Sequence, residues 1–399
     1  MSKKELNFLE QIKVLSLYGY CLSAGLSIAA SQIFVCTNIV AFLLSQAISF
    51  SNPLKTQYSS DIKQIRSAGI LWLLVASIAS LVGMDISHSI VEIIKTFFYF
   101  IFPFSVMHSL ERAKPENAIL LLITSQTVAA CHTLISVSFP ELGLPNTPGA
   151  VTESGQLVLI IPIAFALFYL KSKNEKSSFL LTFCLALLFG ALTVNLKRGP
   201  WMAIFFEFAF LGFLVSRRLL LFTIIGSVLL FLIGPARDRI LALGDHFLIY
   251  GGRYNMWTLG LEILARYPLG LGLNNSSYMR VFEPSLPVTH RHMHNNFLNI
   301  AVETGVIGLA AYLWIFYSIY LLIKNSKEFR LEDNTLKLLP LCLGISIAGW
   351  QIAGLVEYNF GDSEIRLIAL FLIGYLFKLS SKISTKSTSI LSSSDSRSC

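Results

Sequence analysis

Three histidines alternate in the segment His290-Arg-His292-Met-His294. In an extended segment they would share one face, but no carboxylate or cysteine lies near them in sequence, so a metal site is not favoured. His294 is the sharper candidate, because a long apolar run follows it directly and a neutral imidazole can act as a general base near pH 7. The pattern predicts acid–base chemistry at the mouth of an apolar helix.

Two arginines lie where an anion would bind well. Arg198 precedes Gly199, which would let a ligand approach the backbone closely, and a guanidinium binds phosphate through paired hydrogen bonds. The adjacent Lys197 is more simply explained as a cation that faces lipid headgroups. Arg253 follows two glycines at a predicted helix start, where free amides favour an anion. The alternative there is a cation–π pair with Trp257, one helical turn later.

Glu92, Lys95, Glu207 and Glu303 are among the charged residues inside apolar runs, where ionisable groups are functional candidates by default. Glu92 and Lys95 are one helical turn apart and are predicted to neutralise each other. Glu207 and Glu303 have no obvious partner in sequence, and either is suited to hold a cation of the site. A densely polar segment, 357–366, is either a solvated turn or a segment that orients the arginines or binds sugar hydroxyls.

The composition places these residues in a membrane protein. Of 399 residues, 54% are hydrophobic and only 14% are charged, and the mean hydropathy is +0.65. A soluble domain carries about a quarter charged residues, so a cytosolic enzyme, a disordered chain and a fibrous protein are excluded. A spanning helix needs about 20 mostly apolar residues. Twelve such runs are predicted: 14–30, 32–50, 68–83, 88–110, 117–137, 155–170, 178–196, 200–215, 219–234, 296–323, 336–356 and 365–379.

The basic residues predict the orientation in the membrane. With both termini cytoplasmic, twelve alternating spans leave 21 Lys and Arg residues in the inner segments and nine in the outer ones, as the positive-inside rule expects. The net charge of +8 is then mostly topological, and nucleic acid is excluded as a partner. No cleavable signal peptide is visible. The six cysteines avoid the outer loops, so no disulfide or zinc framework is expected.

The long outer loop is the unusual part of this layout. The predicted organisation is nine spans in 1–234, a large periplasmic loop in 235–292, three spans in 293–379 and a Ser-rich, disordered cytoplasmic tail in 380–399. Loops this long are usually functional. The loop is predicted to be partly helical, with a helix over 253–266 and a glycine-rich turn over 270–275. It holds six of the nine outer basic residues, and all six are arginines.

These motifs together resemble the O-antigen ligase and polymerase superfamily of bacterial envelope glycan assembly. The family pattern is His, then Asn, Ser or Gln, nine residues, Gly, two residues and Gly. It matches His294-Asn295, with Gly305 and Gly308 at the required spacing. The Arg-Gly-Pro-Trp segment at Arg198 and the segment 252–272 are similar to the other two landmarks. Gly305 and Gly308 are also expected to permit close helix packing.

The resemblance implies a GT-C-type membrane glycosyltransferase of the inner membrane of a Gram-negative bacterium. It would transfer an O-polysaccharide from undecaprenyl diphosphate to lipid A–core at the periplasmic face, with inversion, no cofactor and no metal. The loop layout favours the ligase, and an O-antigen polymerase that extends the lipid-linked glycan is the alternative. A lipid–glycan transporter is less favoured, because it would place charges near the midplane and show internal repeats.

The resemblance also implies roles for individual residues. His294 would accept the proton of the acceptor hydroxyl, while Arg198 and Arg253 would bind the diphosphate. Arg280 and Arg291 are candidates for contacts with acceptor phosphates. Supporting roles are expected for Asn295, Trp257 and Asp362.

Overall fold

The computed structural model of the chain describes residues 3–49, 58–145, 149–171, 174–287, 289–325 and 334–394. Over these ranges the regular structure is helical and contains no strand. The predicted all-α architecture is therefore confirmed. Some cations that the topology prediction counted lie outside the described residues: Lys55, Lys173, Lys327, Arg330 and Arg397.

Twelve helices overlap the twelve predicted apolar runs. They are α1 (Lys3–Ser23), α2 (Ile28–Ser49), α3 (Ser60–Leu81), α4 (Ile86–Ser109), α5 (Pro115–Ser138), α6 (Ala150–Lys171), α7 (Glu175–Val194), α8 (Arg198–Val215), α9 (Arg217–Leu232), α13 (Asn296–Asn325), α14 (Asn334–Ala353) and α15 (Ser363–Ser394). The poorest match is α1, because the run predicted over 14–30 extends past the end of α1 into α2. Eight of them, α2 to α8 and α13, are long and apolar enough to cross a membrane. A ninth span is counted if α9 is joined to α10 (Gly234–Leu241), which follows it at a bend of 92°. Eight or nine of the predicted spans are thus supported.

The bundle is centred on α6, which packs against α7 and α14. Nearly every side chain from Glu153 to Leu167 is buried. A helix that is apolar around its whole circumference must be covered on all sides, and α6 meets that requirement inside the bundle. Residues 365–377 of α15 are buried almost as completely, whereas α8 and α9 leave large apolar side chains such as Phe213 and Phe222 on the outside, as expected next to lipid.

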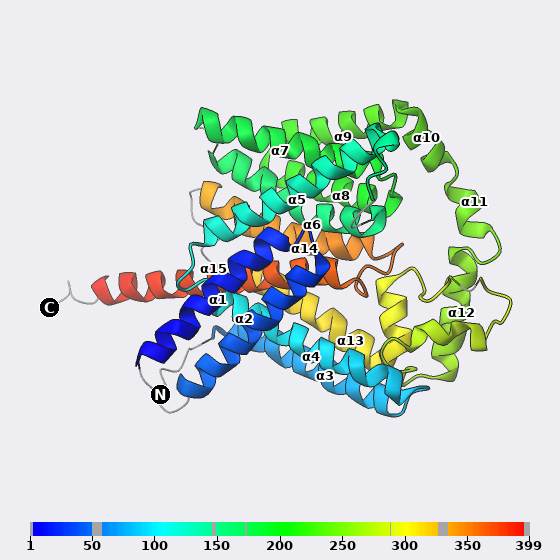
Figure 1. The fold of residues 1–399 in the computed structure, drawn as a ribbon, viewed down its shortest axis with the longest axis horizontal. Helices are drawn as coiled ribbons and strands as arrows, with labels where there is room; N and C mark the ends of the chain where they lie inside the picture. The colour runs from blue at the N-terminus through cyan, green and yellow to red at the C-terminus, as the bar shows by residue number, and fades with distance from the viewer. Residues whose placement is uncertain are drawn as a thin grey trace.

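The long loop forms its own helical layer at one end of the bundle. It contains α10, α11 (Leu243–Leu248), α12 (Arg253–Arg266) and the 3₁₀ helix η2 (Asn275–Val281), which confirms the helix predicted over 253–266. Figure 1 shows α10, α11 and α12 at the end of the molecule opposite both termini. The two chain ends therefore lie on the same side, as an even number of crossings would require.

A break in α13 anchors this layer to the bundle. Gly305 has a φ of 72°, and a Cβ on it would lie 2.4 Å from the carbonyl oxygen of Pro268. The glycine-rich turn packs into the break. Leu271 N–H donates to Val302 O at 2.9 Å, and Gly272 N–H donates to Glu303 O at 2.9 Å. Gly305 is thus required for a backbone break, rather than for the helix packing that the sequence predicted.

Gly308 faces α3, although a Cβ there would meet the side chain of Thr304 on α13 before it reached α3. A Cβ on Gly308 would lie 3.6 Å from Cγ1 of Val75 on α3, and α3 is the main packing partner of α13. At the other end of the chain, α15 continues to Ser394, into the segment for which the sequence predicted a disordered tail. Residues 395–399 of that tail lie outside the described part of the chain.

Candidate active site

His294 lies just before α13 in a backbone conformation that is uncommon for a residue with a side chain. Its φ is 47°, in the left-handed region. Its N–H donates to Nδ1 of His292 at 3.3 Å, and its own Nδ1 lies 3.1 Å from Oε2 of Glu357. An ionised carboxylate can only accept, so Nδ1 of His294 carries the proton and Nε2 is the basic nitrogen. Backbone strain of this kind concentrates at functional sites.

Glu357 joins His294 to Arg253. Its Oε1 accepts from Nη2 of Arg253 at 2.8 Å, and Nε of the same arginine donates to Val356 O at 2.9 Å. Burial acts to raise the pKa of Glu357, but the hydrogen bond from His294 and the charges of His294 and Arg253 outweigh it, so the pKa lies below its usual value. Glu357 is therefore ionised at neutral pH. A guanidinium has five N–H donors, so Arg253 keeps donors for a ligand.

The first turn of α8 packs against the same carboxylate-bearing turn. A Cβ on Gly199 would lie 2.8 Å from Cγ2 of Val356 and 3.9 Å from Cγ of Glu357. The glycine therefore admits a neighbouring protein segment, instead of the ligand that the sequence predicted. This close approach brings Arg198 to Glu357.

Arg198 completes a compact charged group. Its charged neighbours are Arg239, Arg253 and Glu357, and no described residue accepts a hydrogen bond from its guanidinium. We call Arg198, Arg253, His294 and Glu357 the His294 cluster. Because its arginines outnumber its single carboxylate, the cluster has the electrostatic character of an anion site.

Two asparagines hold the cluster together. Asn295 donates from Nδ2 to Leu355 O at 2.9 Å, two residues before Glu357. Asn296 donates from its backbone to Gly354 O at 2.7 Å and from Nδ2 to Asn359 Oδ1 at 2.7 Å. These bonds fasten the turn after α14 to the start of α13, so the carboxylate and the imidazole are placed by the same contacts.

Trp257 contacts the segment that contains the three histidines. Its indole Nε1 donates to Met293 O at 3.0 Å, and its ring packs edge-on against Phe247. Within the described residues it forms no cation–π pair with Arg253, so the stacked arrangement weighed from the sequence is wrong. The indole instead fixes the residue that precedes His294.

The other two histidines have separate environments. Nε2 of His290 lies 2.9 Å from Gly251 O. Burial lowers the pKa of His292 to about 4, and the neighbouring His294 acts in the same direction. In the described part of the chain, no three His, Cys, Asp or Glu side chains are grouped so that they could hold a metal ion.

A polar cavity of about 470 Å³ adjoins the cluster through His292, whose ring centroid lies 4.3 Å from that of His294. We call it the polar cavity. Its charged and aromatic lining consists of Trp72, Glu92, Lys95, Arg291, His292, Glu303, Tyr358, Phe360, Asp362 and Arg366. Of the predicted residues, Arg291 and Asp362 therefore lie in this cavity. Arg280 donates to Leu286 O at 3.1 Å and belongs to the loop structure.

Glu92 and Lys95 form the pair that their spacing predicted, with Lys95 Nζ 3.3 Å from Glu92 Oε2. The other oxygen of Glu92 accepts from Nη2 of Arg366 at 3.3 Å. Glu303 and Glu207, the two glutamates for which the sequence offered no partner, have different surroundings. Glu303 accepts from Ser276 Oγ at 2.7 Å and lines the polar cavity. Glu207 is buried elsewhere, and its carboxylate has no partner among the described residues.

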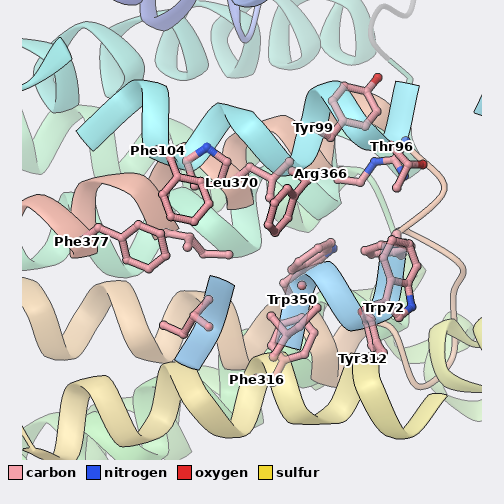
Figure 2. A pocket seen from close by; sticks show the side chains of 17 residues that line it. Trp72, Thr96, Tyr99, Phe104, Tyr312, Phe316, Trp350, Arg366, Leu370 and Phe377 are labelled. Atoms are coloured by element: carbon pink, nitrogen blue, oxygen red, sulfur yellow. The ribbon is translucent and has the colours of Figure 1, made fainter. Parts of the chain in front are cut away.

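Arg366 also closes one end of an apolar pocket of about 100 Å³. Figure 2 shows this pocket lined along its length by rings, including Phe377 and Phe104 at one end and Trp72 beside Arg366 at the other. The guanidinium of Arg366 lies 4.3 Å from the ring centroid of Tyr99. Arg366 thus lines both the apolar pocket and the polar cavity, as do Trp72, Thr96 and Phe360.

The sequence did not single out Glu357 or Arg239 as site residues. The only signal for Glu357 was its place in the polar segment 357–366, which the sequence left either as a solvated turn or as a segment that orients the arginines or binds sugar hydroxyls. Arg239 was counted only as an outer cation. No local sequence pattern marks Glu357 or Arg239 as a site residue, because both lie far from His294 along the chain.

Comparison with known proteins bears on the same region. A comparison with curated proteins found no match. Residues 182–313 match the family described as O-Antigen ligase, and this segment contains Arg198, Arg253 and His294. The match, together with the all-helical architecture, is consistent with membership of the O-antigen ligase and polymerase superfamily.

Proposed function

We propose that the protein is an O-antigen ligase of GT-C type. It transfers a polysaccharide from undecaprenyl diphosphate to lipid A–core at the periplasmic face of a Gram-negative inner membrane. The observation that supports it most is the His294–Glu357–Arg253 chain of contacts, which joins a base to a cation through one carboxylate. Both chain ends are cytoplasmic in this proposal, and no metal or cofactor takes part.

The chemistry is a direct displacement at the anomeric carbon. The acceptor oxygen forms the new glycosidic bond, its proton passes to Nε2 of His294, and the bond from the anomeric carbon to the diphosphate oxygen breaks. The electron pair leaves with the diphosphate, whose growing charge Arg198 and Arg253 stabilise. Glu357 stabilises the imidazolium that forms. The anomeric configuration is inverted.

The polymerase remains the second candidate, because the match to residues 182–313 fits both members of the superfamily. The two differ in the acceptor: a ligase uses lipid A–core, and a polymerase uses another lipid-linked glycan. The long outer loop favours the ligase.

The test is deletion of the gene, followed by staining of the lipopolysaccharide and of the lipid-linked glycan. Loss of all O-chains from lipid A–core, with long lipid-linked polymer still accumulating, is the result expected of a ligase. A lipopolysaccharide capped by a single repeat would identify a polymerase instead. Complementation with His294→Ala should fail although the protein is inserted at the normal level.

A further inference from the structure

The polar cavity has properties that the His294 cluster lacks. Its three cations, Lys95, Arg291 and Arg366, face three carboxylates, and each carboxylate has a partner. Glu92 pairs with Lys95 and Arg366, Glu303 accepts from Ser276, and Asp362 accepts from Thr152 Oγ1 at 2.6 Å. The cavity therefore has balanced charge, whereas the cluster has an excess of arginine. A diphosphate favours the cluster.

Several polar groups in the cavity lack a partner among the described residues. The side chain of Arg366 is only 7% exposed, yet its Nε has no acceptor. The hydroxyl of Tyr358, a half-buried residue, also forms no hydrogen bond within the described chain. Buried donors are normally satisfied, and leaving one unpaired costs about 1–3 kcal/mol. These groups therefore point to a ligand that supplies hydrogen-bond acceptors.

The walls indicate the shape of that ligand. Trp72, Tyr358 and Phe360 present aromatic surfaces to the same space in which the polar groups converge. A sugar ring combines apolar C–H faces with a rim of hydroxyls, so it matches both kinds of surface. The volume of about 470 Å³ lies within the roughly 300–1,000 Å³ of small-molecule sites.

The geometry points to an assignment: we propose that the polar cavity binds the uncharged sugar of the acceptor that carries the attacking hydroxyl. This inference rests on the proposed transfer reaction and names the binding site for its second substrate. His292 joins the cavity to His294, so a sugar in the cavity can present a hydroxyl to the base, which must lie within hydrogen-bond reach of it. Tyr358 and Arg366 are the residues that select the sugar.

Direct binding tests the assignment without a donor. The probe is a deacylated and dephosphorylated core oligosaccharide, titrated calorimetrically into the purified full-length protein. We expect saturable binding that Tyr358→Phe weakens by roughly three- to tenfold, the value of one hydrogen bond. Arg366→Lys should weaken it too, because lysine can keep the ion pair with Glu92 but lacks Nε. Tyr317→Phe is the matched control, since Tyr317 lies exposed on α13.

Competition with diphosphate and steady-state kinetics test whether the saccharide site is separate from the diphosphate site. Inorganic diphosphate should not displace the saccharide, and Tyr358→Phe should raise the acceptor KM while the donor KM stays unchanged. If diphosphate competes, or if Tyr358→Phe and Tyr317→Phe bind the saccharide equally, the assignment is overturned. Saccharide binding as expected from a protein that transfers no glycan would refute the proposed reaction and leave the saccharide site in place.

Discussion

The imidazole of His294 contacts the carboxylate of Glu357 at 3.1 Å, across a sequence separation of 63 residues. The same carboxylate accepts from Arg253 at 2.8 Å. The side chain of Glu357 therefore sets the tautomer of His294, the proposed base. It also positions Arg253, which is proposed to bind the diphosphate. Changes at Glu357 should disturb both, although it touches neither reacting atom.

Replacing this carboxylate tests its role. Glu357→Gln keeps the size but removes the charge that stabilises a protonated His294. We expect the transfer rate to fall by at least about tenfold, but by less than the ~10²–10⁴-fold that a lost general base costs in His294→Ala. Initial rates of the purified enzyme measure this. Glu141→Gln, which changes an exposed carboxylate, is the control, and an unchanged rate in Glu357→Gln would rule out this role of Glu357.

The arginines should not be replaceable by lysine. Arg253→Lys and Arg198→Lys each keep the charge and lose the planar fork, and a charge-assisted hydrogen bond contributes about 1.5–3 kcal/mol. We expect each variant to lose roughly 10- to 100-fold in the rate of transfer. Lys197→Ala should be mild, and Arg266→Lys, exposed at the end of α12, serves as the control. Wild-type rates in both variants, at normal protein levels, would exclude bidentate binding.

His292 should affect stability at acid pH rather than catalysis. Its pKa is about 4 in the folded protein and about 6.5 in an unfolded chain, so the unfolded state takes up the proton first as pH falls. Stability is then complete above about pH 6.5 and is lost towards pH 4. In His292→Gln the unfolding temperature should fall less over that window than in wild type.

The control is His88→Gln, which removes an exposed histidine in the first turn of α4. The groups that act on His292 are His290, His294, Arg253 and Glu357, and all remain in the variant. Because His292 is neutral between pH 5 and 8, the pH dependence of transfer in that range should persist. Its disappearance in His292→Gln would contradict this assignment.

The break in α13 should be sensitive to a single methyl group. Gly305→Ala introduces a Cβ only 2.4 Å from Pro268 O at a φ of 72°, a conformation that costs about 1–3 kcal/mol for other residues. We expect a lower unfolding temperature and a displaced glycine-rich turn. Gly226→Ala on α9, where a Cβ meets nothing within 4 Å, should be neutral. Equal unfolding temperatures would show that the break is not required.

The topology has a direct test in cells. In a variant without native cysteines, Ser285→Cys in the long loop should react with a membrane-impermeant thiol reagent added to the periplasm. Glu175→Cys, at the start of α7, should react only after the membrane is opened. Both positions are exposed, so access to the reagent depends on the side of the membrane. Reversed labelling would place the His294 cluster in the cytoplasm.

The sequence alone determined the parts of this protein that depend on local composition. Apolar runs long enough for a bilayer identified the positions of eleven long helices and overlapped the twelfth, α1, only in part, because hydrophobic length is a local property. His294, Arg198 and Arg253 were singled out as candidates because their chemistry and their neighbours in sequence suit acid–base work and anion binding. Lys95 and Glu92 were paired correctly because a helical turn brings them together.

Only the tertiary structure decided which distant groups meet. Glu357 reaches His294 because Asn296 fastens the end of α14 to the start of α13, and no periodicity in either helix encodes that contact. The break at Gly305 exists because the turn that follows Pro268 packs into α13. Such contacts depend on how helices pack in three dimensions, so residue types predicted the chemistry of the site, and packing determined its geometry.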